Sequence, residues 1–269
     1  MHFKRVKVEI ELGYWEYLWL VLGGLAAGII NTLAGNGSAI TLSLLMWMGL
    51  PAGWANATNR IGVVFQTITA VVSLPKTERN RSLRRSAYPL FIPSIIGAAL
   101  GAWLADETPD TWLRYVIGVV MIFLLFTLLF KPSRWKAEPA QQPQTSSLGL
   151  HLYFFAIGLY AGYIQMGIGI MMLAVLVLYA RYGLVEANII KLIMALVFIV
   201  PAFFVFLAAG KMHWPSGIAL GAGQMAGAWI GTRYFLTHPL AALIIRYVLT
   251  AVLIVAILRI FNVTSLIFG

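Results

Sequence analysis

The sequence predicts an all-α polytopic membrane protein of two homologous repeats, each with three full transmembrane helices and one broken or re-entrant helix pair. Three observations support this class. First, 61% of the 269 residues are hydrophobic and only 10% are charged, whereas a soluble domain carries about 25% charged residues. Second, apolar runs recur at lengths that suit a bilayer. Third, a glycine-containing interruption and the motifs that follow it occur twice.

The formal net charge of +10 lies mostly in predicted loops, where Lys and Arg mark the cytoplasmic side of a membrane protein. Basic residues are not interleaved with aromatic residues as on a nucleic-acid-binding surface, so we expect no nucleic-acid partner. The chain has no cysteine, which excludes disulfides, thiol catalysis and cysteine-ligated metal. Residues 1–13 are basic and then acidic and lack a small-residue cleavage site, so we expect an N-terminal segment and no cleavable signal.

Six apolar runs have the length of one crossing, because a bilayer core of about 30 Å needs about 20 apolar helical residues. Two stretches, residues 16–50 and 151–183, do not fit. Each has roughly 33 residues, about 50 Å of helix, which is too long for one straight crossing and too short for two. Glycines interrupt both near the middle, so each is a broken, tilted crossing or a re-entrant pair of half-helices. The six simple runs are residues 54–74, 88–105, 112–130, 189–209, 215–235 and 240–261.

The motifs around these two stretches recur in order. Asn56 follows Gly37 by 19 residues, Asn188 follows Gly169 by 19 residues, and the two copies are offset by 132. The motif LRYV returns as IRYV at the same offset, and GxxxGAW occurs twice at an offset of 126. These ordered matches indicate an internal repeat. The predicted divisions are an N-terminal segment (1–13), a first transmembrane repeat (14–131), a cytoplasmic linker (132–149) rich in Pro, Gln and Ser, and a second transmembrane repeat (150–269).

Loop charges favour inverted repeats. The loop 76–85 carries five basic residues and one Glu, so it is predicted to be cytoplasmic, whereas the loop 106–110 has no basic residue and is predicted to lie outside. If the basic residues of 232–246 also stay inside, 151–183 must enter and leave by the same face. Inverted repeats of this kind recur in transporters. The alternative has eight spans, parallel repeats and both termini inside, and the basic start of the chain favours it.

The polar residues of the first interruption predict a binding site. Non-helical backbone at membrane depth is tolerated where protein buries it or water reaches it. A half-helix starting near Ser38 would point unpaired N–H groups and its positive dipole end into the protein, which suits an anion, and Ser38 could cap that end. The alternative role for such glycines is close helix packing, which we expect for the glycines of the GxxxG motifs, Gly97, Gly101, Gly223 and Gly227.

Two basic residues occupy corresponding places in the helices that follow the interruptions. Asn59 aligns with Lys191, and Arg60 lies one position further. Charges within apolar helices are costly and usually functional, although both side chains could instead snorkel to the interface. No Asp or Glu falls deep in a predicted span, which argues against a cation carrier, and no catalytic or metal-ligating set is recognisable. We therefore expect no enzyme, metal or cofactor.

The stretch GLAAGIINTLAGNGSAITLSLLMWMGLPAGWANATNR, residues 24–60, resembles the first-repeat signature of the TauE/SafE sulfite exporter family. Residues 158–191, GLYAGYIQMGIGIMMLAVLVLYARYGLVEANIIK, look like its second copy. The resemblance implies a multi-pass transporter of the bacterial inner membrane for sulfur-containing anions such as sulfite, sulfoacetate and other organosulfonates. The chain departs from the family at Asn36, where the family commonly has Gly, and its second turn is less polar.

We therefore predict a secondary transporter with one mid-membrane anion site between the repeats, with a small anion and the lipid bilayer as partners. The alternatives are an anion channel and a non-transporting assembly subunit. Without a buried carboxylate or histidine as proton carrier, uniport or potential-driven export, which gains about 2.3 kcal/mol per 100 mV, is at least as plausible as proton coupling. Direction and oligomeric state stay open. The candidate substrate-binding residues are Asn31, Gly35, Asn36, Gly37, Ser38, Asn56, Asn59, Arg60, Gln66, Gln165, Gly167, Gly169, Asn188, Lys191 and Gln224.

Overall fold

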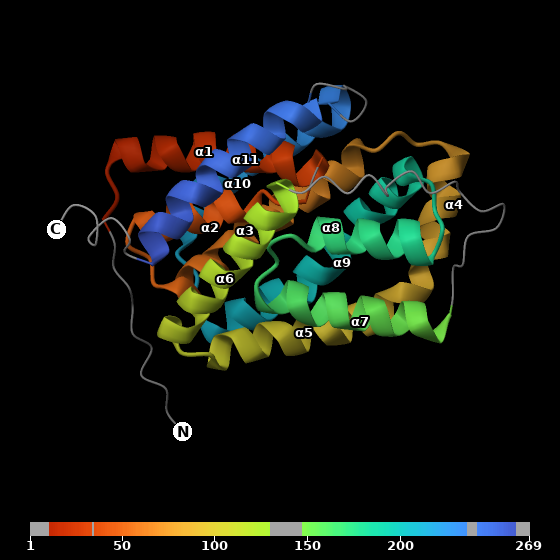
Figure 1. Ribbon diagram of the computed structural model, residues 1–269, viewed down its shortest axis with the longest axis horizontal. Coiled ribbons are helices and arrows are strands. Elements are labelled where there is room, and N and C mark those ends of the chain that lie inside the picture. The colour runs from red at the N-terminus through yellow and green to blue at the C-terminus, as the bar shows by residue number, and fades with distance from the viewer. Residues whose placement is uncertain (1–10, 34, 130–146, 236–240, 262–269) are drawn as a thin grey trace.

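The computed structural model describes residues 11–33, 35–129, 147–235 and 241–261, and within these ranges the chain is helical with no strand. Figure 1 shows the helices running roughly along the long axis of the molecule, except α4, which lies across one end. The helices are α1 (Tyr14–Leu33), α2 (Ser38–Trp47), α3 (Ala52–Ser73), α4 (Glu78–Ala87), α5 (Phe91–Glu107), α6 (Asp110–Leu129), α7 (Leu148–Tyr163), α8 (Ile168–Ala174), α9 (Leu184–Ala209), α10 (Trp214–Ile230) and α11 (Ala241–Ile260).

The predicted all-α membrane class is confirmed. Each of the six apolar runs forms a helix, and in α10 the run continues as a π-helix over Gly231–Phe235. By length and composition, four described segments are able to cross a membrane: Tyr14–Leu33, Glu78–Glu107, Asp110–Thr127 and Leu184–Ala209. The predicted linker 132–149 falls largely outside the described residues, as does most of the N-terminal segment 1–13, so the proposed division into repeats stays a prediction.

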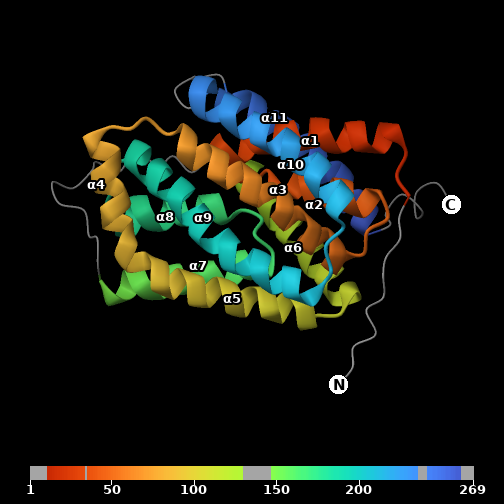
Figure 2. The same ribbon diagram turned by 180° about the vertical axis from the view of Figure 1, so that it is seen from behind.

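The two long stretches are broken helices. α1 has 20 residues and α2 has 10, so the first break lies after residue 33. α7 has 16 residues, and after the second break α8 has 7 and continues as a π-helix over Val175–Tyr179. Figures 1 and 2 show that α2 turns back toward the end at which α1 begins. They also show that α8 turns back toward the α4 end, where α7 begins.

Glycines bring two helix pairs into backbone contact, as the GxxxG motifs predict. A Cβ atom on Gly97 or Gly101 of α5 would meet the carbonyl oxygen of Phe155 or Leu159 of α7. In the same way, α10 packs against α1: Cβ atoms on the α10 glycines would meet α1 carbonyls, and Cβ atoms on the α1 glycines would meet α10 carbonyls. Small residues allow this close approach, which supplies the dispersion energy that holds helices together in lipid. The glycines concerned on α10 and α1 are Gly223, Gly227, Gly24 and Gly28.

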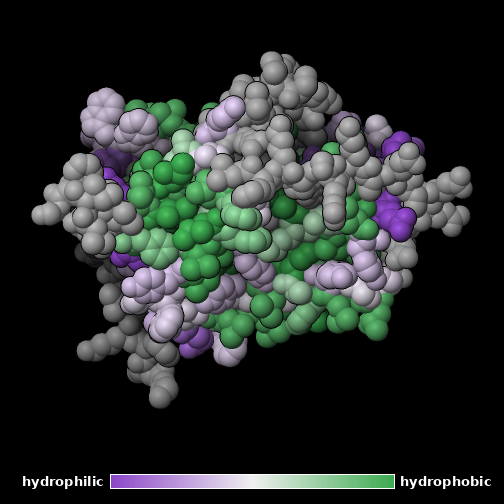
Figure 3. All heavy atoms as spheres, in the orientation of Figure 1, coloured by the Kyte–Doolittle hydropathy of each residue, from purple (hydrophilic) through white to green (hydrophobic). Residues whose placement is uncertain are grey.

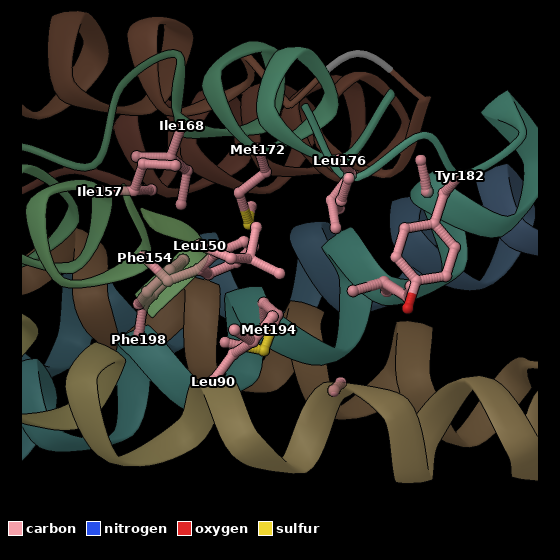
Figure 4. Packing of buried hydrophobic residues seen from close by; sticks show 14 of the residues in the cluster. Leu90, Leu150, Phe154, Ile157, Ile168, Met172, Leu176, Tyr182, Met194 and Phe198 are labelled. Carbon is pink, nitrogen blue, oxygen red and sulfur yellow. The ribbon is translucent and has the colours of Figure 1, made fainter. Parts of the chain in front are cut away.

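One apolar core lies where α7, α8 and α9 meet (Figure 4), and it includes Met172 and the stacked rings of Phe154 and Phe198, with centroids 6.3 Å apart. Apolar side chains also cover the middle of the outer face in Figure 3, with hydrophilic residues toward the two ends of the long axis. This distribution suits a molecule whose long axis crosses a bilayer.

Candidate functional site

The two helix breaks touch each other in the interior. Gly35 has φ +77°, and a Cβ atom there would meet the Cα atom of Gly169 at the start of α8. Only glycine adopts such a φ without strain, and only a residue without a side chain admits the second break so closely. The expectation that Ser38 caps α2 is wrong: Ser38 is the first helical residue, the N-cap position is Gly37, and it makes no side-chain cap.

The second break is formed by two residues in the left-handed region. Gly167 has φ +73°, and Gln165, with a side chain, has φ +68°. A non-glycine residue in this region is uncommon and costs free energy, so surrounding contacts must hold it in place. The side-chain amide of Gln165 is held by Arg60, whose Nη1 donates to Gln165 Oε1 at 3.0 Å.

A small cavity of about 30 Å³ lies between the two breaks. A cavity of this size holds about one water-sized molecule among its polar groups. Side chains or backbone of both breaks and of the helices that follow them, α3 and α9, surround it. The lining residues are Asn31, Gly35, Ser38, Val63, Gln66, Thr67, Ala70, Gln165, Ile168, Gly169, Met172, Lys191, Leu192 and Ala195.

A hydrogen-bond chain fixes the orientation of Gln66 at this cavity. The Gly37 N–H donates to Asn31 Oδ1 at 2.6 Å, and a backbone N–H is only a donor. Asn31 Nδ2 must then be the outward group, and it donates to Gln66 Oε1 at 2.8 Å. With its oxygen occupied, Gln66 presents its NH₂ group, which has no described protein acceptor, as its remaining polar group at the cavity.

The same reasoning fixes Gln165. A guanidinium group only donates, so the bond from Arg60 occupies Gln165 Oε1 and leaves the Gln165 NH₂ group free. Gln165 is 4% exposed and lines the cavity. Two amide groups, one from α3 and one from the second break, thus offer donors to the same space.

Arg60 secures the end of α7. The last four carbonyls of a helix lack intrahelical donors. Arg60 Nη1 donates to Ala161 O at 2.7 Å and Arg60 Nη2 to Gly162 O at 2.8 Å. Asn56 Nδ2 donates to Tyr163 O at 2.8 Å and Asn56 Oδ1 accepts from Arg60 Nη2. With the bond to Gln165, four of the five N–H groups of Arg60 are hydrogen-bonded. Arg60 is 1% exposed, and its guanidinium also lies over the ring of Phe206 at 5.3 Å.

Lys191 occupies the corresponding place at the end of α1. Its Nζ donates to Thr32 O at 3.1 Å, the one hydrogen bond that it makes among the described residues. An ammonium has three donors, so two remain for other acceptors. Lys191 is 2% exposed and lines the cavity, and none of the described residues that line it with Lys191 is an Asp or Glu. Lys191 and the two amides therefore direct unbonded N–H donors at one space, an arrangement whose chemistry suits an anion.

The breaks add backbone donors to this space. Ser38 and Gly169 are in the first turns of α2 and α8, where N–H groups have no acceptor one turn earlier. Both residues line the cavity. The N-terminus of a helix carries a partial positive charge. The α2 N-terminus therefore adds positive potential to the side of the cavity that Lys191 also lines.

The remaining predicted site residues do not line the cavity. Asn59 accepts a hydrogen bond from Thr41 Oγ1 at 2.7 Å. Neither amide atom of Asn36 or Gln224 has a protein partner among the described residues, and both side chains are buried. Gln224 lies against α3, because a Cβ atom on Gly62 would be 2.5 Å from its Oε1. The predicted residues outside the lining are Asn36, Gly37, Asn56, Asn59, Arg60, Gly167, Asn188 and Gln224.

Sequence reasoning missed some lining residues of α3 and α9. Val63 and Ala70 lie one turn before and one turn after Gln66 on α3, and Thr67 follows Gln66 directly. The helical spacing of Asn59, Val63, Gln66, Thr67 and Ala70 was a signal that could have found them. Met172, Leu192 and Ala195 carried no such signal, since they are apolar residues in apolar helices.

A larger cavity of about 650 Å³ opens at the end of the molecule away from α4. It lies among the end of α2, the start of α3 and α6, and the end of α11, and its lining includes Asp110, Arg114 and Arg259. Arg114 donates to Ile260 O at 3.2 Å, and Arg259 lies over the ring of Trp47 at 5.5 Å. Both side chains therefore have partners at this end.

Comparisons with known proteins identify a family and several relatives. The family described as Sulfite exporter TauE/SafE matches residues 20–260. A protein of Sinorhizobium sp. named "Probable membrane transporter protein ORF9" is 27% identical over 249 residues, which cover 93% of this chain and 94% of that protein. A "Probable membrane transporter protein" of Haemophilus influenzae is 25% identical, covering 80% of this chain and 83% of its own. The Escherichia coli strain K12 protein named "Probable membrane transporter protein YfcA" is 24% identical, covering 78% and 77%. No solved structure matches.

Proposed function

This chain belongs to the sulfite exporter TauE/SafE family, and on that basis we propose that it is a secondary transporter that carries a small anion of the sulfite or organosulfonate class across the bacterial inner membrane. The family and the transporter names of the relatives support membrane transport in general. The anion class and the inner membrane are part of the proposal. The same reasoning makes the chain a carrier and not an enzyme.

One observation carries the anion assignment: the amide side chains of Gln66 and Gln165 present free N–H donors to the central cavity, while their oxygens are occupied by neighbours. The amide oxygens of Gln66 and Gln165 each accept from a neighbour, and Lys191 adds a cation. A cation or a neutral hydrogen-bond donor would find few acceptors here, whereas an oxyanion offers several. Donors that neighbouring groups already hold in place lose less conformational freedom when an anion binds.

Two ion pairs support the inverted arrangement over the parallel one. Arg79 Nη2 lies 2.7 Å from Glu186 Oε1, and Lys211 Nζ lies 2.6 Å from Asp106 Oδ1. If 151–183 crossed the membrane once, Glu186 would lie on the face opposite to Arg79, and Lys211 on the face opposite to Asp106. Both pairs therefore support a second broken stretch that returns to the face from which it started.

The helix pairing supports a repeat as well. α1 packs against α10 and α5 against α7, so the first helix of each proposed repeat, α1 or α7, contacts the GxxxG-containing helix of the other repeat. Each buried cation also binds the opposite half: Arg60 binds the end of α7, and Lys191 binds the end of α1. We infer that the repeats interlock around the cavity and that relative movement of the two broken helix pairs opens it to one side and then the other.

The small size of the cavity fits this mechanism. About 30 Å³ is room for about one water molecule and too little for an anion of four or more heavy atoms. A conducting channel would need a continuous path. A narrow cavity that must widen to admit substrate suits alternating access, so we favour a carrier over the channel alternative.

Thermal unfolding of the purified full chain tests the proposal, with sulfite, sulfate, thiosulfate, sulfoacetate and taurine as ligands. Saturating a specific site at a hundred times Kd stabilises the folded state by about 2.7 kcal/mol. We expect one or more of the anions to raise the melting temperature of the wild type and of Lys211→Met, a control on an outer loop, but not of Lys191→Met.

Two results would count against the proposal. If no anion stabilises the wild type, the chain is not an anion carrier, and unchanged cellular transport in Lys191→Met would favour the assembly-subunit alternative. If unitary currents accompany anion flux in planar bilayers and flux shows no counter-transport, the protein is a channel.

A further inference from the structure

The surroundings of Lys191 determine whether its side chain carries a proton, given the proposed anion site. The ammonium of Lys191 is 2% exposed and has one carbonyl partner, Thr32 O. No carboxylate lines its cavity among the described residues. A buried charge without a counter-charge is strongly disfavoured, and a lysine answers by releasing its proton.

The groups around Lys191 make the charged form costlier while the site is empty. From α3 and the second break, the cavity receives the NH₂ groups of Gln66 and Gln165, which are donors like the ammonium itself. From the first break it receives the N-terminal end of α2, whose partial charge is positive. The single favourable partner is the end of α1, where Thr32 O accepts the hydrogen bond.

Titratable groups on the packed elements do not supply a counter-charge. Arg60 of α3 is bound to the end of α7 and is itself a cation. Tyr160 of α7 donates to Met166 O at 2.7 Å. Glu186, at the start of α9, is paired with Arg79. The described residues of α2, α8 and α10 include no Asp, Glu, Lys, Arg, His or Tyr.

We propose that Lys191 takes up one proton when the anion binds and releases it when the anion leaves, so that the protein moves a proton together with its anion. In the empty site the side chain is a neutral amine. One proton from the aqueous side then binds Nζ, and the ammonium pairs with one anion. On the other side the anion and the proton both leave, which restores the amine. A monovalent anion moved in this way transfers no net charge.

Arg60 could not serve in this role, although it lies at the matching helix end. A guanidinium keeps its proton in proteins, and four of the N–H groups of Arg60 are already bonded. Its charge is spread over two helix-end carbonyls and two side-chain oxygens. The difference between the two cations therefore separates a fixed charge from one that is free to change.

The test measures proton uptake on binding of methanesulfonate, an anion that does not itself titrate near neutral pH. Titration calorimetry of the purified full chain in buffers of different ionisation enthalpy gives the number of protons bound per anion. We expect up to one proton taken up by the wild type and by the control Lys211→Arg. We also expect affinity to fall about tenfold per pH unit between the pH at which the empty site loses its proton and the higher pH at which the occupied site loses it.

Lys191→Arg separates charge from titration. With a permanent cation at this position, we expect binding with no proton uptake and with an affinity that does not change with pH. If this variant does not fold, the proton count on the wild type still decides, because it needs no substitution.

Each outcome has a meaning. If the wild type binds methanesulfonate with no proton uptake and unchanged affinity from pH 6 to 9, the coupling is refuted while the anion site stands. If the wild type binds none of the tested anions at any pH, the proposed function fails and the coupling fails with it. In liposomes at zero potential, a methanesulfonate gradient should drive protons in the same direction through the wild type and not through Lys191→Arg.

Discussion

The two helix breaks are built alike but finished differently. At the second break, the carbonyls that end α7 are bound by Arg60 and Asn56, and the Arg60 charge is shared among four oxygens. At the first break, the corresponding cation is Lys191, which binds a single carbonyl of α1. In both places a cation from one half of the chain lies at the C-terminal, partly negative end of a helix from the other half.

The comparison shows why one protein needs both arrangements. A cation whose N–H groups are nearly all hydrogen-bonded stabilises the fold, because its removal leaves buried acceptors without donors. Such a cation has few free N–H groups for a ligand. An unsaturated cation stabilises less and keeps donors for a substrate. We therefore propose that the second break is the fixed side of the site and the first break the side that responds to substrate.

The largest effect is expected for Arg60→Met. The change keeps the length and apolar stem of the side chain but leaves two α7 carbonyls, Gln165 and Asn56 without donors, and each buried unsatisfied group costs about 1–3 kcal/mol. We expect the variant to lose most of its stability and to resist recovery as a monodisperse protein. Size-exclusion profiles and thermal unfolding measure this, with Arg81→Met on the exposed face of α4 as control. A stable Arg60→Met protein would show that Arg60 is not the anchor of the second break.

Two glycine substitutions compare the backbones of the two breaks. Gly35→Ala and Gly167→Ala both place a side chain in the left-handed region, which costs roughly 1–2 kcal/mol. In Gly35→Ala the new atom also meets the backbone of Gly169, whereas in Gly167→Ala it meets the movable side chain of Leu124, at 2.6 Å.

We therefore expect a clearly larger fall in melting temperature for Gly35→Ala than for Gly167→Ala. Equal losses would mean that the contact between the breaks is loose. Both variants carry the same strain, so the difference isolates the contact.

Asn31→Asp tests the donor chain of the first break. The new carboxylate still accepts from the Gly37 N–H, but it has no donor for Gln66 Oε1. Gln66 must then turn its NH₂ group toward residue 31 and its oxygen toward the cavity, next to an added negative charge. We expect anion affinity to fall at least about a hundredfold, or about 2.7 kcal/mol, with the fold intact.

Ligand titration measures the loss, and Asn80→Asp is the matched control, since Asn80 Nδ2 binds Pro75 O near α4. Unchanged affinity in Asn31→Asp would show that Gln66 does not face the substrate.

The smallest effect is expected for Thr41→Val, which removes the donor to Asn59 Oδ1. Neither residue lines the cavity, so stability should fall by about 1 kcal/mol and anion affinity should stay the same. Thr69→Val, whose hydroxyl binds its own helix at Phe65 O, is the control. A loss of affinity in Thr41→Val would place Asn59 in the substrate path.

Much of this architecture could be predicted from composition and spacing. The lengths of the apolar runs predicted the helices, and the GxxxG motifs at Gly97 and Gly223 predicted two closely packed helix pairs. The polar interruption at residues 35–38 and the two aligned basic positions gave the region of the site. These features are local or periodic, so they are readable along one chain.

The roles of individual residues were not readable in this way. Whether a buried cation is saturated depends on acceptors about a hundred residues away, as with Arg60 and Ala161. The cap of α2 was misplaced because Gly37 and Ser38 are adjacent and only the backbone angles separate them. The sequence also did not indicate the proton-carrying role proposed for Lys191, because a lysine in an apolar helix was expected to be a fixed cation.

The central claim is that the anion sits between the two breaks against Lys191, and anomalous diffraction tests it most directly. Crystals of the full chain soaked in selenite, the selenium counterpart of sulfite, would show the anion position at the selenium edge, and the chain has no cysteine to react with it. We predict a peak in the cavity, within hydrogen-bond reach of Lys191 Nζ and of the Gln66 and Gln165 amides. A peak only in the larger cavity beside Arg114 and Arg259, with nothing between the breaks, would contradict the account.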